Sequence, residues 1–554
     1  MITNKQLADY IFPEVKETIE DLEKRYPNRD LPEGAEVTRF APSPTGFLHT
    51  GSLFMSMICH KIAKQTNGVF YIRLEDTDTK REIEGSGLEL LKQLKAFNIV
   101  PDEGYLGDHE IGNYGPYIQS KRADIYRVVI KHLLEQGLAY PCFCSTDDLA
   151  EIRKLQESKK ENPGYYGKYA RCRDLSNEER MERIKNGDPF VIRFRSSGDY
   201  HNKIQVHDMV HGDFEIAQND QDIVIYKSDK LPTYHFAHVV DDHFMRTTTV
   251  IRGGEWIASL PIHVELFATL GWKAPNYAHM PVIMKVDENG NKRKLSKRKD
   301  TEAAVSYFVE EGYPAEGLII YLMTLANSNF EQYILDNKLE GMDNFKLAFD
   351  KFAIDGSLFD MGKVNFFSKE FLGKLNKHEI TLRAKAYAEK YNPKLFDLIT
   401  RDEKYFEEIM NIEREKENPR KDYEKFSIIP DVIGFFYDDI YSELIKEPLP
   451  FNEKFSKEVI ASTLTAMKEL NLDLDEQSWF NNMKEIAVKE GYAANNKEFK
   501  ANPEAYKGTV GDVAELLRIT FTARKNAPNL YYVMKILGKE KCNKRIDTII
   551  SLLK

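Results

Sequence analysis

Two short segments of this sequence carry residue types that bind phosphate groups. In the turn at 41–52, APSPTGFLHTGS, Gly46 and Gly51 would let the backbone approach a ligand closely, and His49 could donate to a phosphoryl oxygen. The segment at 291–300, NKRKLSKRKD, contains six basic residues. Each has a plain alternative: a Pro/Gly turn with a surface or core histidine, and a solvated basic patch or localisation signal.

The elements around the turn favour a nucleotide site. A strand-like run at 37–40 precedes it, and apolar residues spaced by three and four positions predict a helix over 53–62 that ends at 67–68. The run at 69–74 then indicates a buried parallel strand and completes a βαβ unit. The first turn of such a unit lies at the carboxyl edge of the sheet, where phosphates meet the free N–H groups of the helix. We therefore expect an α/β fold with a Rossmann-like, doubly wound parallel sheet.

Farther along the chain, the pattern predicts an interrupted α/β domain followed by helices. A helix is expected at 117–136, and strand-like runs return at 190–194, 223–226 and 249–251. Late helices are expected from Asp512 as N-cap and over 530–537, ending at Gly538. The predicted division is a helical extension at 1–36, α/β halves at 37–116 and 215–272 around an α+β insertion at 117–214, a further domain at 273–365, and all-α domains at 366–554.

Composition narrows the class of protein. The 554 residues are 42% hydrophobic and 30% charged, with a formal net charge of −10 and no apolar run near the ~20 residues of a membrane helix. The acidic N-terminal segment resembles neither a secretion signal nor a transit peptide. Five cysteines make no disulfide framework. We expect a cytoplasmic, monomeric protein without a membrane partner. Net charge does not indicate a general nucleic-acid binder, although basic residues could cluster locally.

Several motifs, taken in order, resemble the class I aminoacyl-tRNA synthetases in their glutamyl form. They are RFAPSPTGFLHTG at 39–51, RLEDTD at 73–78, GPYIQS at 115–120, PTY at 232–234, VVDD at 239–242, VIRGGEW at 250–256 and KLSKR at 294–298. The last matches the second signature of that class, usually written KMSKS. The resemblance is strong over 37–365 and weaker in the helical remainder, at 517–520 and 536–538.

The resemblance implies a glutamate–tRNA ligase. In such an enzyme the α-carboxylate of L-glutamate attacks the α-phosphorus of ATP, with Mg²⁺ on the pyrophosphate, and the adenylate then esterifies the terminal ribose of tRNA(Glu). The insertion at 117–214 would bind the acceptor stem, 273–365 would contact the stem and carry the KLSKR loop, and 366–554 would bind the anticodon. Neither step needs a protein nucleophile, so alignment and well-placed cations would carry the chemistry.

The resemblance also assigns residues to catalysis, to glutamate binding and to ATP binding. The catalytic set is His49, Gly51, Lys294 and Lys297. The glutamate set is Arg39, Ala41, Ser43, Glu75, Tyr234, His238 and Arg252. The ATP set is His49, Gly51, Ser52, Glu255, Lys294, Leu295, Ser296, Lys297 and Arg298. Buried guanidinium groups suit carboxylates, whereas glutamine would leave such a charge under-satisfied. The alternatives are structural ion pairs for Arg39 and Arg252, and a ribose-binding acid for Glu75.

The sequence departs from the family pattern in three places. Ser52 stands where the first signature ends in histidine, and 36 residues precede that signature. Cys142, Cys144 and Cys172 resemble a zinc site of some relatives, with Asp174 where a fourth ligand, histidine, would lie. Zinc prefers four ligands, so structural Zn²⁺ and three unremarkable cysteines both remain open.

Four rival functions follow from the same motifs. A glutaminyl-tRNA synthetase usually reads Pro-Pro-Glu-Pro-Asn-Gly at 41–46 and ends in β-barrels instead of helices. A truncated enzyme that glutamylates a modified tRNA base would lack 366–554. A non-catalytic synthetase-derived RNA-binding protein would be expected to have lost the charged residues of the site. A small-molecule adenylylating enzyme would not need so long a remainder. The sequence favours the glutamyl enzyme.

Overall fold

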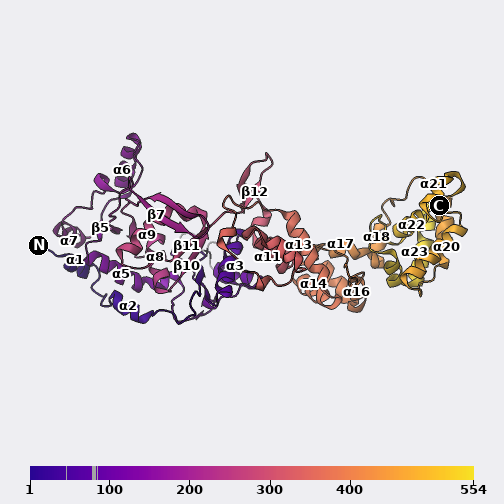
Figure 1. Ribbon diagram of the computed structural model, residues 1–554, viewed down its shortest axis with the longest axis horizontal. Coiled ribbons are helices and arrows are strands. Elements are labelled where there is room, and N and C mark those ends of the chain that lie inside the picture. Colours follow the sequence, from indigo (N-terminus) through magenta and orange to yellow (C-terminus); the bar gives the residue numbers. More distant parts are fainter. Residues whose placement is uncertain (45, 78–82, 84) are drawn as a thin grey trace. The chain divides into compact units, whose positions relative to one another are not determined.

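The computed structural model describes residues 1–44, 46–77, 83 and 85–554, which divide into two compact units (Figure 1). Unit 1 comprises Met1–Phe308 and Ile319–Met361, and unit 2 comprises Val309–Leu318 and Gly362–Lys554. Thr45 and Asp78 of the predicted motifs lie outside the described residues.

A largely parallel sheet forms the centre of unit 1. Strand β1 (Val37–Phe40) pairs with β2 (Val69–Ile72), and β2 with β3 (Glu103–Tyr105). Strand β10 (Thr249–Gly253) pairs with β11 (Asn276–Met280), again in parallel. The two groups meet at β1 and β10, where the Thr248 N–H donates to the Val37 carbonyl at 3.0 Å. The spatial order β3-β2-β1-β10-β11 confirms the predicted doubly wound fold, because the chain builds away from β1 first in one direction and then in the other.

Helices cover both faces of this sheet. On one face, α3 (Thr50–Gln65) packs on β1, and the Thr38 hydroxyl donates to the Cys59 carbonyl at 2.7 Å. On the other face, Val37 and Tyr71 share a buried core with α5 (Ala123–Glu135), α8 (Tyr234–Phe244) and α9 (Leu260–Thr269). Since successive strand residues point to opposite faces, Arg39 lies on the α8 side with Val37. The helix expected at 117–136 is shorter, because residues Gln119–Arg122 form a 3₁₀ turn before α5.

The insertion contributes a separate antiparallel sheet of order β5-β6-β9, made of β5 (Ala139–Cys142), β6 (Val191–Phe194) and β9 (Val224–Tyr226). Helices α6 (Thr146–Ser158) and α7 (Asn177–Lys185) lie between β5 and β6 in sequence. The predicted boundary at residue 214 falls inside β8 (Gly212–Ala217). Its partner β7 (Lys203–Asp208) extends the central sheet at β11, whereas β9 returns to the insertion. The chain thus crosses between the two sheets more than once.

The N-terminal extension packs on the same core. Helices α1 (Asn4–Ile11) and α2 (Ile19–Arg25) bury Leu22, together with Phe12 and Tyr26 beside them, against α5 and α8. The Lys131 ammonium of α5 donates to the Val15 carbonyl at 2.9 Å. The extension is therefore part of the folded core of unit 1.

The remaining elements of unit 1 flank this core. They are α4 (Ser86–Ala96), β4 (Glu110–Ile111), the antiparallel pair β12 (Met284–Val286) and β13 (Lys292–Lys294), and α12 (Phe330–Asp336). Helices α10 (Val305–Glu310) and α11 (Ala315–Ala326) run across the division between the units. None of the helices in the described ranges combines the length and hydrophobicity needed to cross a membrane.

Unit 2 is helical, as predicted, and the described residues from 362 onward contain no β-strand. Its helices are α13 (Met361–Lys374), α14 (Lys377–Tyr391), α15 (Pro393–Arg401), α16 (Glu403–Met410), α17 (Ile429–Ile433), α18 (Asp438–Leu444), α19 (Lys457–Ala466), α20 (Glu476–Lys489), α21 (Asn496–Ala501), α22 (Val510–Thr522) and α23 (Leu530–Leu553).

Of the two late helix boundaries that were predicted, one is wrong and one is confirmed. Asp512 is not the N-cap of α22: Thr509 is, and Asp512 occupies the third helical position, where each side chain accepts from the other's backbone N–H. A threonine with an acidic residue three positions later forms this reciprocal capping box. The predicted stop at Gly538 is confirmed, since its φ of +78° breaks the helical geometry, but a second helical segment follows directly.

Candidate functional site

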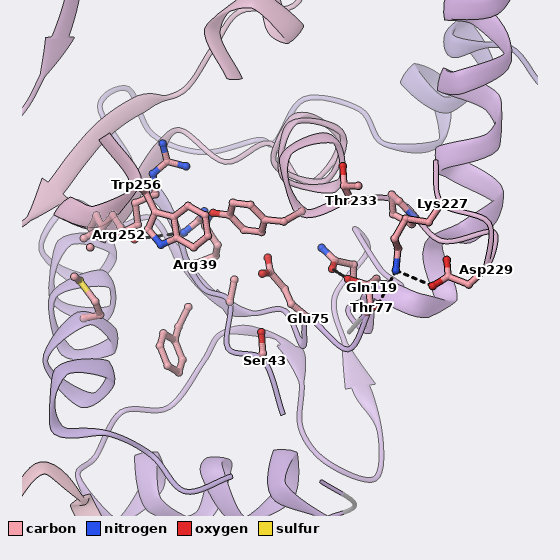
Figure 2. Close-up of a pocket in the computed structure, with 17 residues that line it drawn as sticks. Arg39, Ser43, Glu75, Thr77, Gln119, Lys227, Asp229, Thr233, Arg252 and Trp256 are labelled. Atoms are coloured by element: carbon pink, nitrogen blue, oxygen red, sulfur yellow. Dashed lines mark hydrogen bonds and ion pairs between the residues drawn. The ribbon is translucent and has the colours of Figure 1, made fainter. Parts of the chain in front are cut away.

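A cavity of about 860 Å³ opens where the strand order reverses, at the carboxyl ends of β1 and β10. Ligands bind at this position in doubly wound sheets, because the connections to the two neighbouring strands run to opposite faces and leave a crevice. Arg39 comes from β1, Arg252 from β10 and Tyr234 from the start of α8. Figure 2 shows Arg39, Arg252 and Trp256 at one side of the pocket, and Lys227 and Asp229 at the other.

The cavity gathers six of the seven residues predicted for glutamate. The residues that line it are Arg39, Ala41, Ser43, Glu75, Tyr234 and Arg252. The seventh, His238, is fully buried outside the lining: its Nδ1 lies 2.7 Å from Asp242 Oδ2 and its Nε2 lies 3.1 Å from the Tyr277 hydroxyl. The structure thus corrects its predicted place, since residue 238 lies one helical turn beyond Tyr234, inside the core.

Asp242 is the hub of a buried charge network below the cavity. It lies 3.1 Å from Arg39 Nε and 2.8 Å from Arg73 Nη1. Burial alone would raise the pKa of Asp242, but these guanidinium groups hold it well below its usual range. Arg73 also contacts Glu75 at 3.0 Å, and burial raises the pKa of Glu75 against that attraction. Arg39 therefore makes the structural ion pair of the alternative interpretation while still lining the cavity.

Arg252 has different surroundings. Its Nε donates to His279 Nε2 at 2.9 Å and its Nη1 lies 3.2 Å from His263 Nδ1. Its Nη2 is buried and has no hydrogen-bond partner among the described residues. In the part of the chain that the structure describes, no carboxylate lies within ion-pair distance of the Arg252 guanidinium group. The guanidinium group is thus fixed in place with its charge uncompensated by direct contact.

Sequence reasoning missed part of the far wall. Lys227 and Asp229, which pair with each other at 2.9 Å, line the cavity beside Gln119 and Thr77. The only available signal was their position, a few residues before the PTY motif. Trp256, at the end of a predicted motif, packs its ring 4.3 Å from that of Tyr234. These side chains line opposite sides of the cavity (Figure 2).

A second cavity of about 270 Å³ adjoins the first, with Phe40, Met55 and Gly253 lining both. Predicted ATP residues that line it are His49, Gly51, Ser52, Glu255, Lys294 and Leu295. The other three, Ser296, Lys297 and Arg298, are not in its lining. The two signature segments nevertheless meet, because the Lys297 ammonium contacts the Phe47 carbonyl.

His49 is held in one tautomer at the start of α3. Its Nδ1 accepts the Gly51 N–H at 2.8 Å, which caps the helix. Burial, with smaller contributions from Lys297 and Lys294, lowers the pKa of His49 to about 4. The ring is therefore neutral at pH 7 and carries its proton on Nε2. At a positive helix end, this N–H can donate to an anion.

Three cysteines of the insertion also come together. The thiols of Cys142, Cys144 and Cys172 all lie within 4.8 Å of one another, and the Tyr165 hydroxyl is 3.3 Å from the first two. Hydrogen bonding to Cys172 lowers the pKa of Cys142, whereas burial raises the pKa of Cys144 and the hydrogen bond to Cys142 raises that of Cys172. Asp174 is not part of the group. Its side chain is exposed and pairs with Arg195 at 3.5 Å, which corrects the predicted fourth ligand.

Comparison with known proteins agrees with this geometry. Residues 36–353 match the family model described as tRNA synthetases class I (E and Q), catalytic domain, and residues 386–550 match an anticodon binding domain. The chain is 44% identical to glutamate–tRNA ligases of Clostridium beijerinckii and Clostridium perfringens (strain SM101), over 99% of its own length and all of theirs.

A solved structure extends the likeness to three dimensions. A glutamate tRNA ligase from Elizabethkingia meningosepticum, in complex with its amino acid, superposes with a TM-score of 0.75 at 27% identity, over 94% of this chain and 100% of that one. Full-length identity, both domain matches and the shared fold lead to one conclusion: the chain belongs to the glutamate–tRNA ligase family of class I aminoacyl-tRNA synthetases.

Proposed function

We propose that this protein joins L-glutamate to tRNA(Glu) in two steps driven by ATP. The observation that carries the proposal is the pair of adjoining cavities at the carboxyl ends of β1 and β10. One is lined by two arginines, and the other by a helix N-terminus, a neutral histidine and a lysine. An amino acid and a nucleotide bound there would meet at the shared wall.

The larger cavity would hold glutamate. Arg39 and Arg252 would each receive a carboxylate, because a guanidinium group can bind both carboxylate oxygens at once. Glu75 would accept from the ammonium group, with Ser43 and Tyr234 completing the contacts. Glutamine would place a neutral amide against a buried guanidinium group, a loss that can discriminate between substrates without editing.

The smaller cavity and the lysine loop would hold ATP, which enters as its Mg²⁺ complex. The Nε2–H of His49 and the backbone beside Gly51 would bind phosphate oxygens from one side. Lys294 and Lys297 would approach from the other, carried by a loop that includes Ser296 and Arg298. A carboxylate oxygen of glutamate would form a bond to the α-phosphorus while the bond to pyrophosphate breaks. The positive groups would stabilise the charge that builds up on pyrophosphate.

In the second step, a hydroxyl of the terminal ribose would attack the carbonyl carbon of the adenylate and AMP would leave. We assign the insertion at 117–214 to the acceptor end, 273–365 to the stem and 366–554 to the anticodon. The match of residues 386–550 to an anticodon binding domain supports the last assignment. Single-stranded anticodon bases can be read by stacking and by contacts at their edges.

ATP–pyrophosphate exchange tests the proposal. We expect exchange with glutamate, and a requirement for tRNA(Glu), since the chain resembles the few synthetases that need tRNA before they activate the amino acid. Exchange with glutamine alone would instead support a glutaminyl-tRNA synthetase. Tight tRNA binding without exchange for any amino acid would support a non-catalytic RNA-binding protein.

We also propose that Cys142, Cys144 and Cys172 hold a structural zinc ion, with the Tyr165 hydroxyl near the fourth position. Three clustered thiols suit this metal. We expect about one zinc per chain by elemental analysis, and loss of most of it in Cys172→Ser. Cys542→Ser, a buried cysteine of unit 2, is the matched control and should retain the metal. Equal zinc contents in the two variants would contradict this assignment.

A further inference from the structure

Arg252 is 6% exposed, yet hydrogen-bonding histidines surround it where a buried guanidinium group usually has a carboxylate partner. Its Nε and Nη1 contact His279 and His263 at 2.9 and 3.2 Å, and Nη2 has no partner in the described structure. The face of the Tyr277 ring lies 4.8 Å from the guanidinium carbon. Both imidazoles must therefore be held in the tautomer whose nitrogen accepts a hydrogen bond from Arg252.

For His279, the group that does so is Asp208. Because His279 Nε2 accepts from Arg252, the ring proton must lie on Nδ1, which is 2.7 Å from Asp208 Oδ2. Asp208 is itself held by the backbone N–H groups of Val210 and His211, each at 3.0 Å. A fixed carboxylate thus selects the tautomer of His279, as carboxylates do behind metal-binding histidines.

For His263, the corresponding group is His235. Since His263 Nδ1 faces Arg252, its proton lies on Nε2, which is 3.0 Å from His235 Nδ1. Burial is the main reason why the pKa values of both His263 and His279 lie below the ordinary value. Neither ring competes with Arg252 as a second cation at neutral pH.

This arrangement depends on strand register. Arg252 of β10 and His279 of β11 are direct partners in the parallel ladder, so their side chains share one face of the sheet. His263 reaches the same guanidinium group from α9. A carboxylate at either position would hold Arg252 equally well, but it would neutralise the charge that a substrate carboxylate needs. Imidazoles hold the side chain without that loss.

We propose that His263 and His279, with Asp208 behind the latter, are positioning residues that keep Arg252 oriented and uncompensated for a carboxylate of the substrate. This inference rests on the proposed function, because it requires that Arg252 bind glutamate. It adds three side chains that lie outside the cavity lining. Their effect must therefore act through Arg252.

Amide substitutions test the inference, because asparagine can place its carbonyl near the Nδ1 position of histidine and glutamine near the Nε2 position. His279 faces Arg252 with Nε2, so His279→Gln should keep a near-normal KM for glutamate, whereas His279→Asn should raise it roughly ten-fold or more. His263 faces Arg252 with Nδ1, so the preference should reverse: His263→Asn should be the milder variant and His263→Gln the more severe one. The KM for ATP should change less than about two-fold in all four.

The reciprocal pattern separates positioning from folding, because all four variants introduce a polar amide at a buried site. His243→Gln is the matched control: this histidine is largely buried against Trp272, contacts Glu23 and lies outside the cavity, so its KM for glutamate should not change. Equal KM values for Asn and Gln at each position, or a parallel rise in the KM for ATP, would overturn the inference. An Arg252→Gln variant with a normal KM for glutamate would instead overturn the proposed site.

Discussion

His49 links helix capping to the ionisation state of the site. The Gly51 N–H occupies its Nδ1, and its pKa is about 4 in the folded protein against an ordinary 6.5. Between these values the unfolded chain binds a proton that the folded chain does not bind, so stability falls as the pH drops from 6.5 to 4. The lowered pKa of His49 in the folded protein therefore destabilises the protein only below about pH 6.5, where the unfolded chain binds the extra proton.

We therefore predict a pH-dependent difference between the wild type and His49→Asn. Asparagine can accept the Gly51 N–H but does not titrate, so the melting temperature of the variant relative to the wild type should rise as the pH falls from about 6.5 to 4. Thermal melts of both proteins across this range measure the difference. A constant difference would mean that His49 titrates normally in the folded state.

The second prediction at the scale of the residue concerns Lys297. Its ammonium contacts the Phe47 carbonyl in the signature turn, so it can reach phosphates bound there. Lys297→Ala should lower single-turnover adenylate formation by about 10²–10³, the usual cost of one preorganised donor, and leave tRNA affinity nearly unchanged. Lys299→Ala, an exposed lysine of the same segment, should keep normal adenylation. Normal adenylation by Lys297→Ala would refute its assignment.

At the scale of the element, Gly538 divides α23. Its φ of +78° and ψ of 161° lie in a region that is open almost only to glycine, and a Cβ there would meet no atom within 4 Å. The expected cost of Gly538→Ala is therefore backbone strain alone, about 1–3 kcal/mol. Urea denaturation of the full-length protein, followed by a signal that reports on unit 2, measures this loss in the free energy of unfolding.

The control for this prediction is Gly511→Ala, a glycine within the helical geometry of α22. Alanine has the higher helix propensity, by up to about 1 kcal/mol, so this variant should be neutral or slightly more stable. Equal effects of the two substitutions would show that Gly538 does not need its glycine backbone.

At the scale of the whole molecule, the two units have separate cores. Leu22 of the N-terminal extension is buried in the core of unit 1, and Ile549 of α23 in the core of unit 2. Leu22→Ala should destabilise unit 1 by about 2–5 kcal/mol. In calorimetry, the midpoint temperature of the unit 1 transition should fall, whereas that of unit 2 should not change. Ile549→Ala should do the reverse. A single transition that both variants lower equally would show that the units unfold together.

Much of the fold was predictable because its signals are local. The 3.6-residue period of α3 and the Gly538 stop depend on neighbours a few positions apart. The boundary at 214 was not predictable in this way. Strands β8 and β9 follow one another in sequence but belong to different sheets, and only long-range pairing decides which sheet each one joins.

The sequence by itself determined the family, because Arg39, Glu75, His49 and the lysine segment stand in short motifs whose order is characteristic of one family. The tertiary structure decided which side chains surround them. It excluded Asp174 from the cysteine cluster, and it brought His263 and His279 to Arg252. The reason is physical: spacing along a chain fixes what lies on one helix or strand, whereas register and packing between distant segments fix what touches across them.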